Sequence, residues 1–472
     1  PLATDQTGFD IVIGNPPYIK EYTNRAAFEG FRNSPYYQGK MDLWYGFACI
    51  GLDLLKEGGT ETFIAQNNWI TSAGASKFRK KVTSETEIRI FTDFGNYKVF
   101  KSAGIQTMVF LLRKCNPKDK YFIQFSILKN DNIQELQLID FLSSNEVEHD
   151  CYSKFKLSFD NKANYSKSIS FSSPQVQKII DKILLAKNFS LKSNEVIQGI
   201  VGAPDKAFII PDTKLNNFSL NEKKFIKKYY TNSSGISDLN IIYLSAKNFK
   251  SNDLSDYPNF KTHFEEFKNE LIKAKIKYKT PNKPYYFLHR EREERFFQRG
   301  SKIICQIRTS SPEFLYTENE YYVSRAANII KSNRIDLKYL STLLNSKLIH
   351  FYYKNNGATQ GNILKFDKGP LLEIPIKHKA DSELLPLIFN YIQHCKYLDL
   401  KEIQKEINSV VDALIFELYF LEDFQSKGIE IEKHAKELFK PIDQLSEEQK
   451  IAEIKAVYEE LRKKENPLRN QI

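Results

Sequence analysis

The chain has 472 residues, which corresponds to about three domains of ordinary size. Hydrophobic residues make up 41% and aromatic residues 13% of it, so a mainly disordered protein is excluded. Lys and Arg number 69 against 58 Asp and Glu, and the net charge of +11 suits a polyanionic partner. No apolar run approaches the roughly 20 residues that span a bilayer, and the cysteines never form a C-x-x-C pair. We therefore expect a cytoplasmic protein with neither a disulfide framework nor a metal site.

Residues 1–115 alternate between strand and helix patterns. Residues 9–14 (FDIVIG) form a β-branched apolar run that is typical of a buried parallel strand. Further strands are expected over residues 60–65, 88–94 and 106–112. Helices are expected over residues 72–84 and over residues 43–54, and the latter helix should end at Gly58 and Gly59. This alternation predicts the C-terminal part of a doubly wound α/β sheet, which is a partial Rossmann-like fold.

The character of the sequence changes twice after residue 115. Residues 116–165 are polar, with one strand expected over residues 121–128, and predict a junction between domains. Residues 166–380 mix short strands, turns and one amphipathic helix over residues 258–279, which predicts an α+β domain. Residues 381–472 carry helical patterns almost throughout and predict a helical C-terminal segment.

The most informative motif is Asn15-Pro16-Pro17-Tyr18, which directly follows the first strand. Open α/β sheets bind ligands at the carboxyl ends of their strands. If the side-chain oxygen of Asn15 and the carbonyl of Pro16 each accept one N–H of an amide-like amine, its nitrogen becomes pyramidal and its lone pair faces a methyl donor. The prolines restrict φ, and the Tyr18 ring offers a stacking face for a base. The alternative is that Asn-Pro-Pro is only a turn.

With this motif, the chain resembles the S-adenosylmethionine-dependent N6-adenine DNA methyltransferases of the Type IIG restriction-modification kind, which carry a TaqI-like C-terminal specificity domain. Further segments that carry the resemblance are residues 41–70, Phe94-Gly95, Val99-Phe100 and residues 106–112. The resemblance implies that Phe100 covers a flipped adenine opposite Tyr18, and that Asn15 and Asp42 lie near the cofactor. The alternatives are a core aromatic at Phe100 and a residue favoured by the helix dipole at Asp42.

The sequence departs from this family at the cofactor site. The family binds S-adenosylmethionine through a Phe-x-Gly-x-Gly loop after its first strand and an acidic residue after its second, and neither precedes Asn15. We therefore expect the chain to be the C-terminal part of a larger protein and to be inactive alone. The cofactor loop would then lie on the missing N-terminal part or on a partner subunit.

Residues 166–380 contain the expected target-recognition domain. The segments that resemble the family's specificity domain in order and spacing are residues 198–208, 257–271, 283–287 and 343–353. The resemblance implies double-stranded DNA as the partner, and outward lysines on the helix over residues 258–279 suit phosphate neutralisation. The candidate DNA contacts are Lys273, Lys275, Lys277, Lys279, Tyr285, Tyr286 and Arg308. The alternatives are a solvated helix face and tyrosines packed in a core, and the run over residues 289–295 (HREREER) nearly cancels in charge, which predicts a solvated face.

The sequence thus predicts a fragment of a site-specific, adenine-N6 DNA methyltransferase from a restriction-modification or phage-defence system. Glutamine-N5 protein methyltransferases share the Asn-Pro-Pro-Tyr motif but lack a basic region of the length of residues 166–376. N4-cytosine transfer is disfavoured because that group usually has Ser at the position of Asn15. A non-enzymatic hypothesis is a DNA-binding specificity module without activity of its own.

Overall fold

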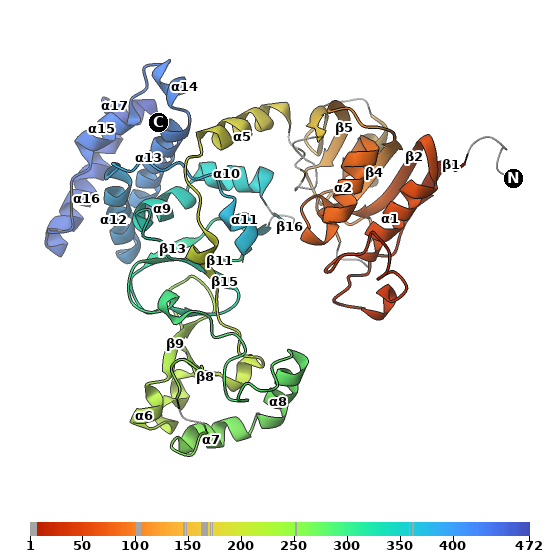
Figure 1. The fold of residues 1–472 in the computed structure, drawn as a ribbon. Coiled ribbons are helices and arrows are strands. Elements are labelled where there is room, and N and C mark those ends of the chain that lie inside the picture. The colour runs from red at the N-terminus through yellow and green to blue at the C-terminus, as the bar shows by residue number, and fades with distance from the viewer. Residues whose placement is uncertain are drawn as a thin grey trace. The chain divides into compact units, whose positions relative to one another are not determined.

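The computed structural model describes residues 7–100, 105–144, 147, 149–161, 169, 171, 173–250, 253–357, 359–360 and 363–472. The chain forms two compact units, Pro1–Ile180 and Asp181–Ile472. Each unit has a hydrophobic core of its own, and Figure 1 follows the elements of both along the chain.

The first unit is built on a six-stranded mixed sheet of order β1-β2-β4-β3-β5-β6. Its strands are β1 (Phe9–Gly14), β2 (Leu55–Gln66), β3 (Thr86–Asp93), β4 (Thr107–Lys114), β5 (Lys120–Leu128) and β6 (Tyr152–Asp160). The helices formed by its described residues are α1 (Leu43–Leu54), α2 (Ser76–Glu85), α3 (Glu135–Ser143) and α5 (Pro174–Ala186), the last of which continues into the second unit. The pair β1–β2 is parallel, and α1 lies in the crossover that such a pair requires.

Helices α1 and α2 contact each other and pack against the sheet (Figure 1). Beneath them lies an aromatic core in which Phe78 of α2 is 5.3 Å from Trp44 and 4.9 Å from Trp69, measured between ring centroids. All three side chains are buried. Large aromatic side chains contribute most of the apolar area in such a core, so this cluster fixes the helices on the sheet.

Strand β1 has the expected residues and parallel pairing, but the expectation of a buried strand is wrong. Among the described residues β1 pairs only with β2, so it forms one edge of the sheet. Ile11 is 64% and Ile13 78% exposed. Strand side chains point to the faces of a sheet, so burial of Ile11 and Ile13 would require an element packed on that face.

Two further expectations differ from the structure in this unit. Residues 116–165, expected as a junction, contribute the antiparallel strands β5 and β6 to the six-stranded sheet. Gly58 and Gly59, expected to end a helix, lie inside β2, which begins directly after α1. Gly58 has a φ of +81°, a conformation that glycine adopts without strain.

The second unit combines three small sheets with helices. The sheets have the orders β14-β9-β10-β8, β13-β11-β15-β7 and β12-β17-β16. The strands are β7 (Val196–Gln198), β8 (Ile209–Pro211), β9 (Ile226–Tyr230), β10 (Leu239–Ile242), β11 (Lys302–Gln306), β12 (Arg308–Thr309), β13 (Phe314–Thr317), β14 (Tyr322–Val323), β15 (Ala327–Ile330), β16 (Thr359–Gln360) and β17 (Ile363–Lys365). The expected helix over residues 258–279 is divided into α7 (Pro258–Glu265) and α8 (Lys268–Lys277).

Helices dominate the end of the second unit, as the sequence predicts. The helices of this unit are α6 (Leu220–Lys223), α7, α8, α9 (Leu337–Leu344), α10 (Lys347–Asn356), α11 (Lys368–Leu372), α12 (Leu384–Tyr397), α13 (Lys401–Tyr419), α14 (Leu421–Gln425), α15 (Ile431–Leu438), α16 (Glu447–Arg462) and α17 (Pro467–Gln471). The long helix α13 packs against α12, α15 and α16. In the part of the chain that the structure describes, no helix has both the length and the apolar character that crossing a membrane requires.

Candidate functional site

The Asn-Pro-Pro-Tyr motif lies at the carboxyl end of β1, and the Tyr18 hydroxyl connects it to β2. This hydroxyl is 2.8 Å from Oδ1 of Asn15 and 2.7 Å from the carbonyl oxygen of Ile64. Burial, and next the charge of Asp42, raise the pKa of Tyr18 to about 12, so the hydroxyl keeps its proton at neutral pH. One proton therefore serves two acceptors, and Tyr18 holds the Asn15 amide in a defined direction.

Within the motif, the two prolines differ in their surroundings. Pro16 is buried, whereas Asn15 and Pro17 are exposed. Because proline restricts φ and has no N–H, the turn presents Asn15 from a stiff backbone. The Asn15 amide is therefore accessible to a bound molecule while its direction is set by Tyr18.

The structure brings the ring of Phe100 near that of Tyr18. Their ring centroids are 6.5 Å apart and the ring planes are tilted by 50°. A planar base between two parallel rings requires a separation of about 7 Å, which is two carbon contacts of about 3.5 Å each. A role for the two rings in holding a base stays a prediction.

Two polar residues that the sequence analysis missed support this site. Oδ1 of Asp93, at the end of β3, accepts hydrogen bonds from the backbone N–H of Gly95 at 2.8 Å and from Nδ2 of Asn67 at 3.2 Å. Burial raises the pKa of Asp93. Asp93 therefore ties the start of the segment that carries Phe100 to the end of β2. Its position directly before Phe94-Gly95 was the available signal.

Asp42 is enclosed by the first unit. It precedes α1 and is 3% exposed. Burial raises the pKa of Asp42 to about 6, and the backbone N–H of Trp44 and next the charge of Lys20 oppose the rise. A role for Asp42 beside the cofactor stays a prediction.

The predicted DNA-contacting lysines divide into exposed and buried side chains. Lys273, Lys277 and Lys279 are exposed, as is Arg308 of β12. The expectation that Lys275 points outward is wrong, because it is 4% exposed and its Nζ donates a 2.6 Å hydrogen bond to the carbonyl of Phe287. Lys275 lies four residues after the buried Leu271 and thus on the core side of α8.

The two candidate tyrosines are not freely exposed. Tyr286 is 5% exposed and packs in the core of the second unit, so the expectation of a loop contact is wrong for it. Tyr285 is partly buried, with the ammonium group of Lys268 5.7 Å from its ring centroid. Both rings belong to the aromatic packing between α7, α8 and the segment that follows them.

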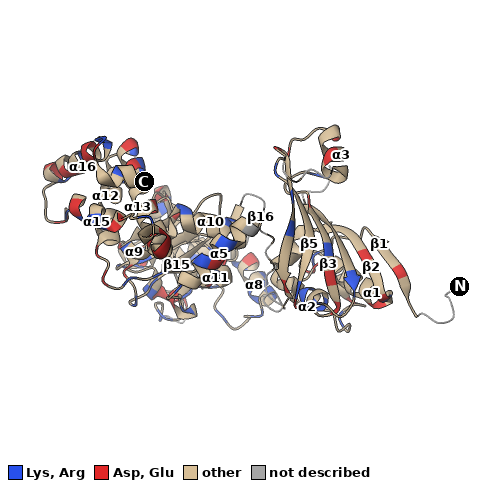
Figure 2. Cartoon of the chain, turned by 90° about the horizontal axis from the view of Figure 1, so that it is seen from above, with Lys and Arg blue, Asp and Glu red and all other residues tan. Residues whose placement is uncertain are grey.

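Charges on the C-terminal helices are mixed in sign, as Figure 2 shows for α15 and α16. Lys450 lies 2.8 Å from Glu447 and Lys463 lies 2.6 Å from Glu460, one turn away in each case. Such pairs neutralise each other locally, so these helices do not form a continuous basic face.

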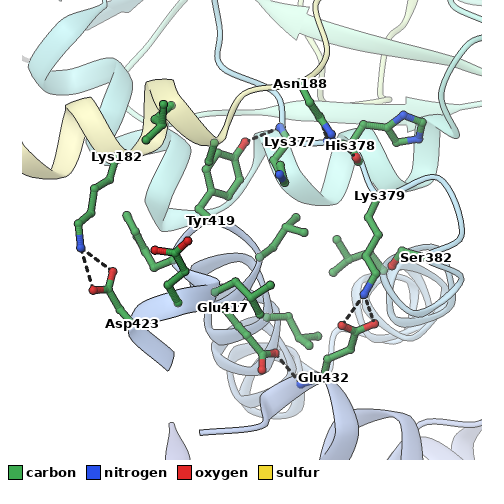
Figure 3. A pocket seen from close by; sticks show the side chains of 18 of the residues that line it. Lys182, Asn188, Lys377, His378, Lys379, Ser382, Glu417, Tyr419, Asp423 and Glu432 are labelled. Carbon is green, nitrogen blue, oxygen red and sulfur yellow. Dashed lines mark hydrogen bonds and ion pairs between the residues drawn. The ribbon is translucent and has the colours of Figure 1, made fainter. Parts of the chain in front are cut away.

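A cavity of about 610 Å³ lies in the second unit between the end of α5, residues 377–385 and helices α13 to α15 (Figure 3). Six of its nineteen lining residues are leucines. The charged groups at its rim are paired, Lys182 with Asp423 at 2.6 Å and Lys379 with Glu432 at 2.7 Å. Glu417 accepts hydrogen bonds from two backbone N–H groups at the start of α15. The cavity therefore presents an apolar wall and no charged side chain free for catalysis among those named.

Sequence models of two families match the chain. Residues 2–100 match the Eco57I restriction-modification methylase, and residues 247–376 match the TaqI-like C-terminal specificity domain. The chain is therefore similar to a restriction-modification methylase over its first part and to a TaqI-like specificity domain further along. The first match contains Asn15, Tyr18 and Phe100, and the second contains α8 and Arg308. The resemblance expected from the sequence is thereby confirmed.

Curated relatives and a solved structure agree with this assignment. The chain is 25% identical over 451 residues to the Type II methyltransferase M.HindII of Haemophilus influenzae, with 87% of this chain and 83% of the relative covered. It is 24% identical over 450 residues to M.HincII of the same species, with the same shares covered. The Type IIL restriction-modification enzyme MmeI, solved in complex with DNA, has a similar fold, with a TM-score of 0.58 at 12% identity. That match covers 95% of this chain, which spans 57% of the MmeI chain.

Proposed function

We propose that the chain forms the target-base pocket and the specificity domain of an enzyme that methylates adenine at N6 in a particular DNA sequence. S-adenosylmethionine is the proposed methyl donor, and restriction-modification or phage defence is the proposed setting. The observation that carries the proposal is the Asn-Pro-Pro-Tyr motif at the carboxyl end of β1 with Phe100 6.5 Å from Tyr18. The matched families and the Type II methyltransferase relatives support it.

The hydrogen bonds around Tyr18 suit the entry of an amino group. An adenine N6–H can donate to Oδ1 of Asn15 once the Tyr18 hydroxyl donates to the carbonyl of Ile64 alone, which is already 2.7 Å away. No buried donor is left unpaired by that exchange, so it avoids the cost of an orphaned hydroxyl. The carbonyl of Pro16 is the proposed acceptor for the second N6–H.

Two acceptors on one amino group change its reactivity. Hydrogen bonds from both N6–H groups favour a pyramidal nitrogen, whose lone pair then lies outside the adenine π-system and faces the donor. When bound, S-adenosylmethionine would supply the electrophilic methyl group as its S–CH3 bond breaks to leave the thioether, and the methylated nitrogen would then release one proton to water. Tyr18 and Phe100 would hold the extruded base between their rings, as an enzyme that acts on a base inside a duplex requires.

The described residues do not form a cofactor cradle by themselves. No glycine-rich loop adjoins β1, and the carboxylate of Asp42 is enclosed. Beside the exposed Ile11 and Ile13 of β1, helix α1 also leaves three apolar side chains about half exposed, namely Phe47, Ile50 and Leu54. We infer that another segment, from the natural protein or from a partner subunit, pairs with the free edge of β1 and supplies the cofactor loop.

Duplex DNA is the proposed partner of the second unit. The match to the TaqI-like specificity domain covers α7, α8 and β11 to β17. Exposed Lys273, Lys277, Lys279 and Arg308 in this region suit contacts to phosphates. Since the chain contains a basic region of this length, DNA is favoured over a glutamine side chain of a protein as substrate.

The test is methyl transfer by the natural full-length protein and its Asn15→Ala variant under single-turnover conditions. Loss of one preorganised acceptor lowers the rate on the order of 10²-fold or more, while affinity for DNA stays near that of the wild type. Asn33→Ala is the matched control, because Asn33 is an exposed asparagine of the same unit outside the motif. A normal rate in Asn15→Ala would remove Asn15 from the mechanism.

A further inference from the structure

The charged run over residues 289–295 (HREREER) has three acidic and three arginine residues. In the structure these charges do not all neutralise one another within the run. Each of its three acidic residues has a partner other than Arg290 or Arg292. Glu291 pairs with Lys283 at 2.5 Å, Glu293 pairs with Arg295 at 2.9 Å, and Glu294 accepts a 3.0 Å hydrogen bond from the Tyr322 hydroxyl. The two remaining arginines form no salt bridge with any of the described residues.

These two arginines differ in what their side chains contact. Arg292 donates from Nε to the carbonyl of Gly199 at 3.1 Å and from Nη2 to Oε1 of Gln198 at 3.2 Å, so it is fixed in place. Arg290 is exposed, and no hydrogen bond from its guanidinium reaches a described residue. Its backbone is held by a pair of 3.1 Å hydrogen bonds with Val201. Arg290 therefore presents a free guanidinium from a firmly positioned backbone.

The surroundings of Arg290 carry an excess of positive charge. Burial and then Arg290, Lys275, Lys283 and Arg292 lower the pKa of His289, which shows how closely these cations approach one another. Burial and next the charge of Lys283 lower the pKa of Lys275 to about 8, and the charge of Glu291 opposes this shift. Nδ1 of His289 is buried without a hydrogen-bond partner among the described residues. Cations that are partly removed from water and lack counter-charges destabilise a fold unless an anion binds beside them.

We propose that Arg290 binds a backbone phosphate of duplex DNA and that Lys275 and Arg292 provide the positive potential at that point. The inference rests on the proposed function and adds a defined contact to it. A guanidinium binds two phosphate oxygens through parallel N–H groups, which makes a free arginine well suited to this role. Arginine also reads guanine edges in the major groove. The clustering of cations favours the phosphate, because a neutral base edge does not compensate their charge.

The test compares Arg290→Gln with Arg295→Gln in the complete 472-residue chain. Arg295 is an exposed arginine of the same run that already has a carboxylate partner. Fluorescence anisotropy measures binding to two labelled duplexes of unrelated sequence between about 50 and 200 mM salt. We expect Arg290→Gln to bind both duplexes about tenfold more weakly, and the log-log salt slope to fall in magnitude by about 0.9. Arg295→Gln should match the wild type.

Arg290→Lys separates charge from the folding of the loop. It keeps the positive charge, so its salt slope should equal that of the wild type although its affinity is lower. The phosphate contact would be overturned if Arg290→Gln had the affinity and salt slope of the wild type. It would also be overturned if the salt slope of Arg290→Lys were as small as that of Arg290→Gln. A loss confined to one of the two duplexes would also overturn it and would indicate base recognition. If the wild-type chain binds neither duplex, the proposed function is contradicted as well. If the wild type binds and Arg290→Gln binds equally well, only the role of Arg290 is contradicted.

Discussion

Glu61 gives the first unit a stability that depends on pH. Its side chain is fully buried in β2, and neither carboxylate oxygen has a hydrogen-bond partner among the described residues. A methyl group at Gly51 of α1 would collide with Oε2 of Glu61, so the helix lies directly against this carboxyl group. Burial raises the pKa of Glu61 from 4.5 to about 9, and the charge of Lys81 opposes the rise. At neutral pH Glu61 is therefore protonated in the folded chain and ionised in the unfolded chain.

The sign and size of the effect follow from this difference in proton binding. Because the folded-state pKa is the higher one, the folded state binds the extra proton, and stability is fully present below pH 4.5 and is lost as pH rises toward 9. Each pKa unit corresponds to about 1.4 kcal/mol, so ionisation of the unfolded state at pH 7 lowers the free energy of unfolding by about 3 kcal/mol. Glu61→Gln has nearly the same shape and no proton to lose. It should be more stable than the wild type at about pH 8 and equal to it at about pH 4.5.

Tryptophan fluorescence during urea unfolding measures this effect selectively. Both tryptophans of the chain, Trp44 and Trp69, lie in the core of the first unit. Glu57→Gln is the matched control, because Glu57 is an exposed residue of the same strand. If Glu61→Gln changes stability by the same amount at both pH values, or if its difference from the wild type equals that of Glu57→Gln, a buried neutral Glu61 is excluded.

Three further predictions concern the pocket and the cofactor. Tyr18→Phe keeps the stacking ring and removes the hydroxyl that directs Asn15. Single-turnover methylation should therefore be slowed less by Tyr18→Phe than by Tyr18→Ala, which also loses about 1 to 3 kcal/mol of stacking. Equal losses of rate in the two variants would show that the ring has no role. Asp93→Ala removes the acceptor for Gly95 and Asn67, so methylation should slow while DNA affinity is retained, and a parallel loss of affinity would argue against a local effect on Phe100. Calorimetry should detect no S-adenosylmethionine binding by these 472 residues alone, and tight binding would show that they contain a complete cofactor site.

Local patterns in the sequence were sufficient to place the Asn-Pro-Pro-Tyr motif at the end of β1. The β-branched run over residues 9–14 forms β1, and the motif after it lies where an open sheet exposes its strand ends. The meeting of Tyr18 and Phe100 depends on the order of strands, and the resemblance to a family supplied that long-range information. Asp93 was missed because a single aspartate at the end of a strand has many possible roles.

Side-chain direction and charge pairing could not be predicted in the same way. An apolar strand pattern indicates burial but does not say which element covers the strand, and Ile11 and Ile13 of β1 are exposed among the described residues. Lys275 was assigned to an outer face although the helical period places it on the same side as Leu271. In the run over residues 289–295, the pairing of each glutamate depends on Lys283, Arg295 and Tyr322, so its near-neutral composition concealed a free arginine.

The position of the transferred methyl group tests the central claim most directly. Duplex DNA is incubated with the natural full-length protein and isotopically labelled S-adenosylmethionine, digested to nucleosides and analysed by mass spectrometry. The Asn15→Ala protein serves as the parallel sample. The account predicts labelled N6-methyladenine with the wild type and a yield lower on the order of 10²-fold or more with Asn15→Ala. Label in N4-methylcytosine or in protein glutamine, or no label in DNA with the wild-type protein, would contradict it.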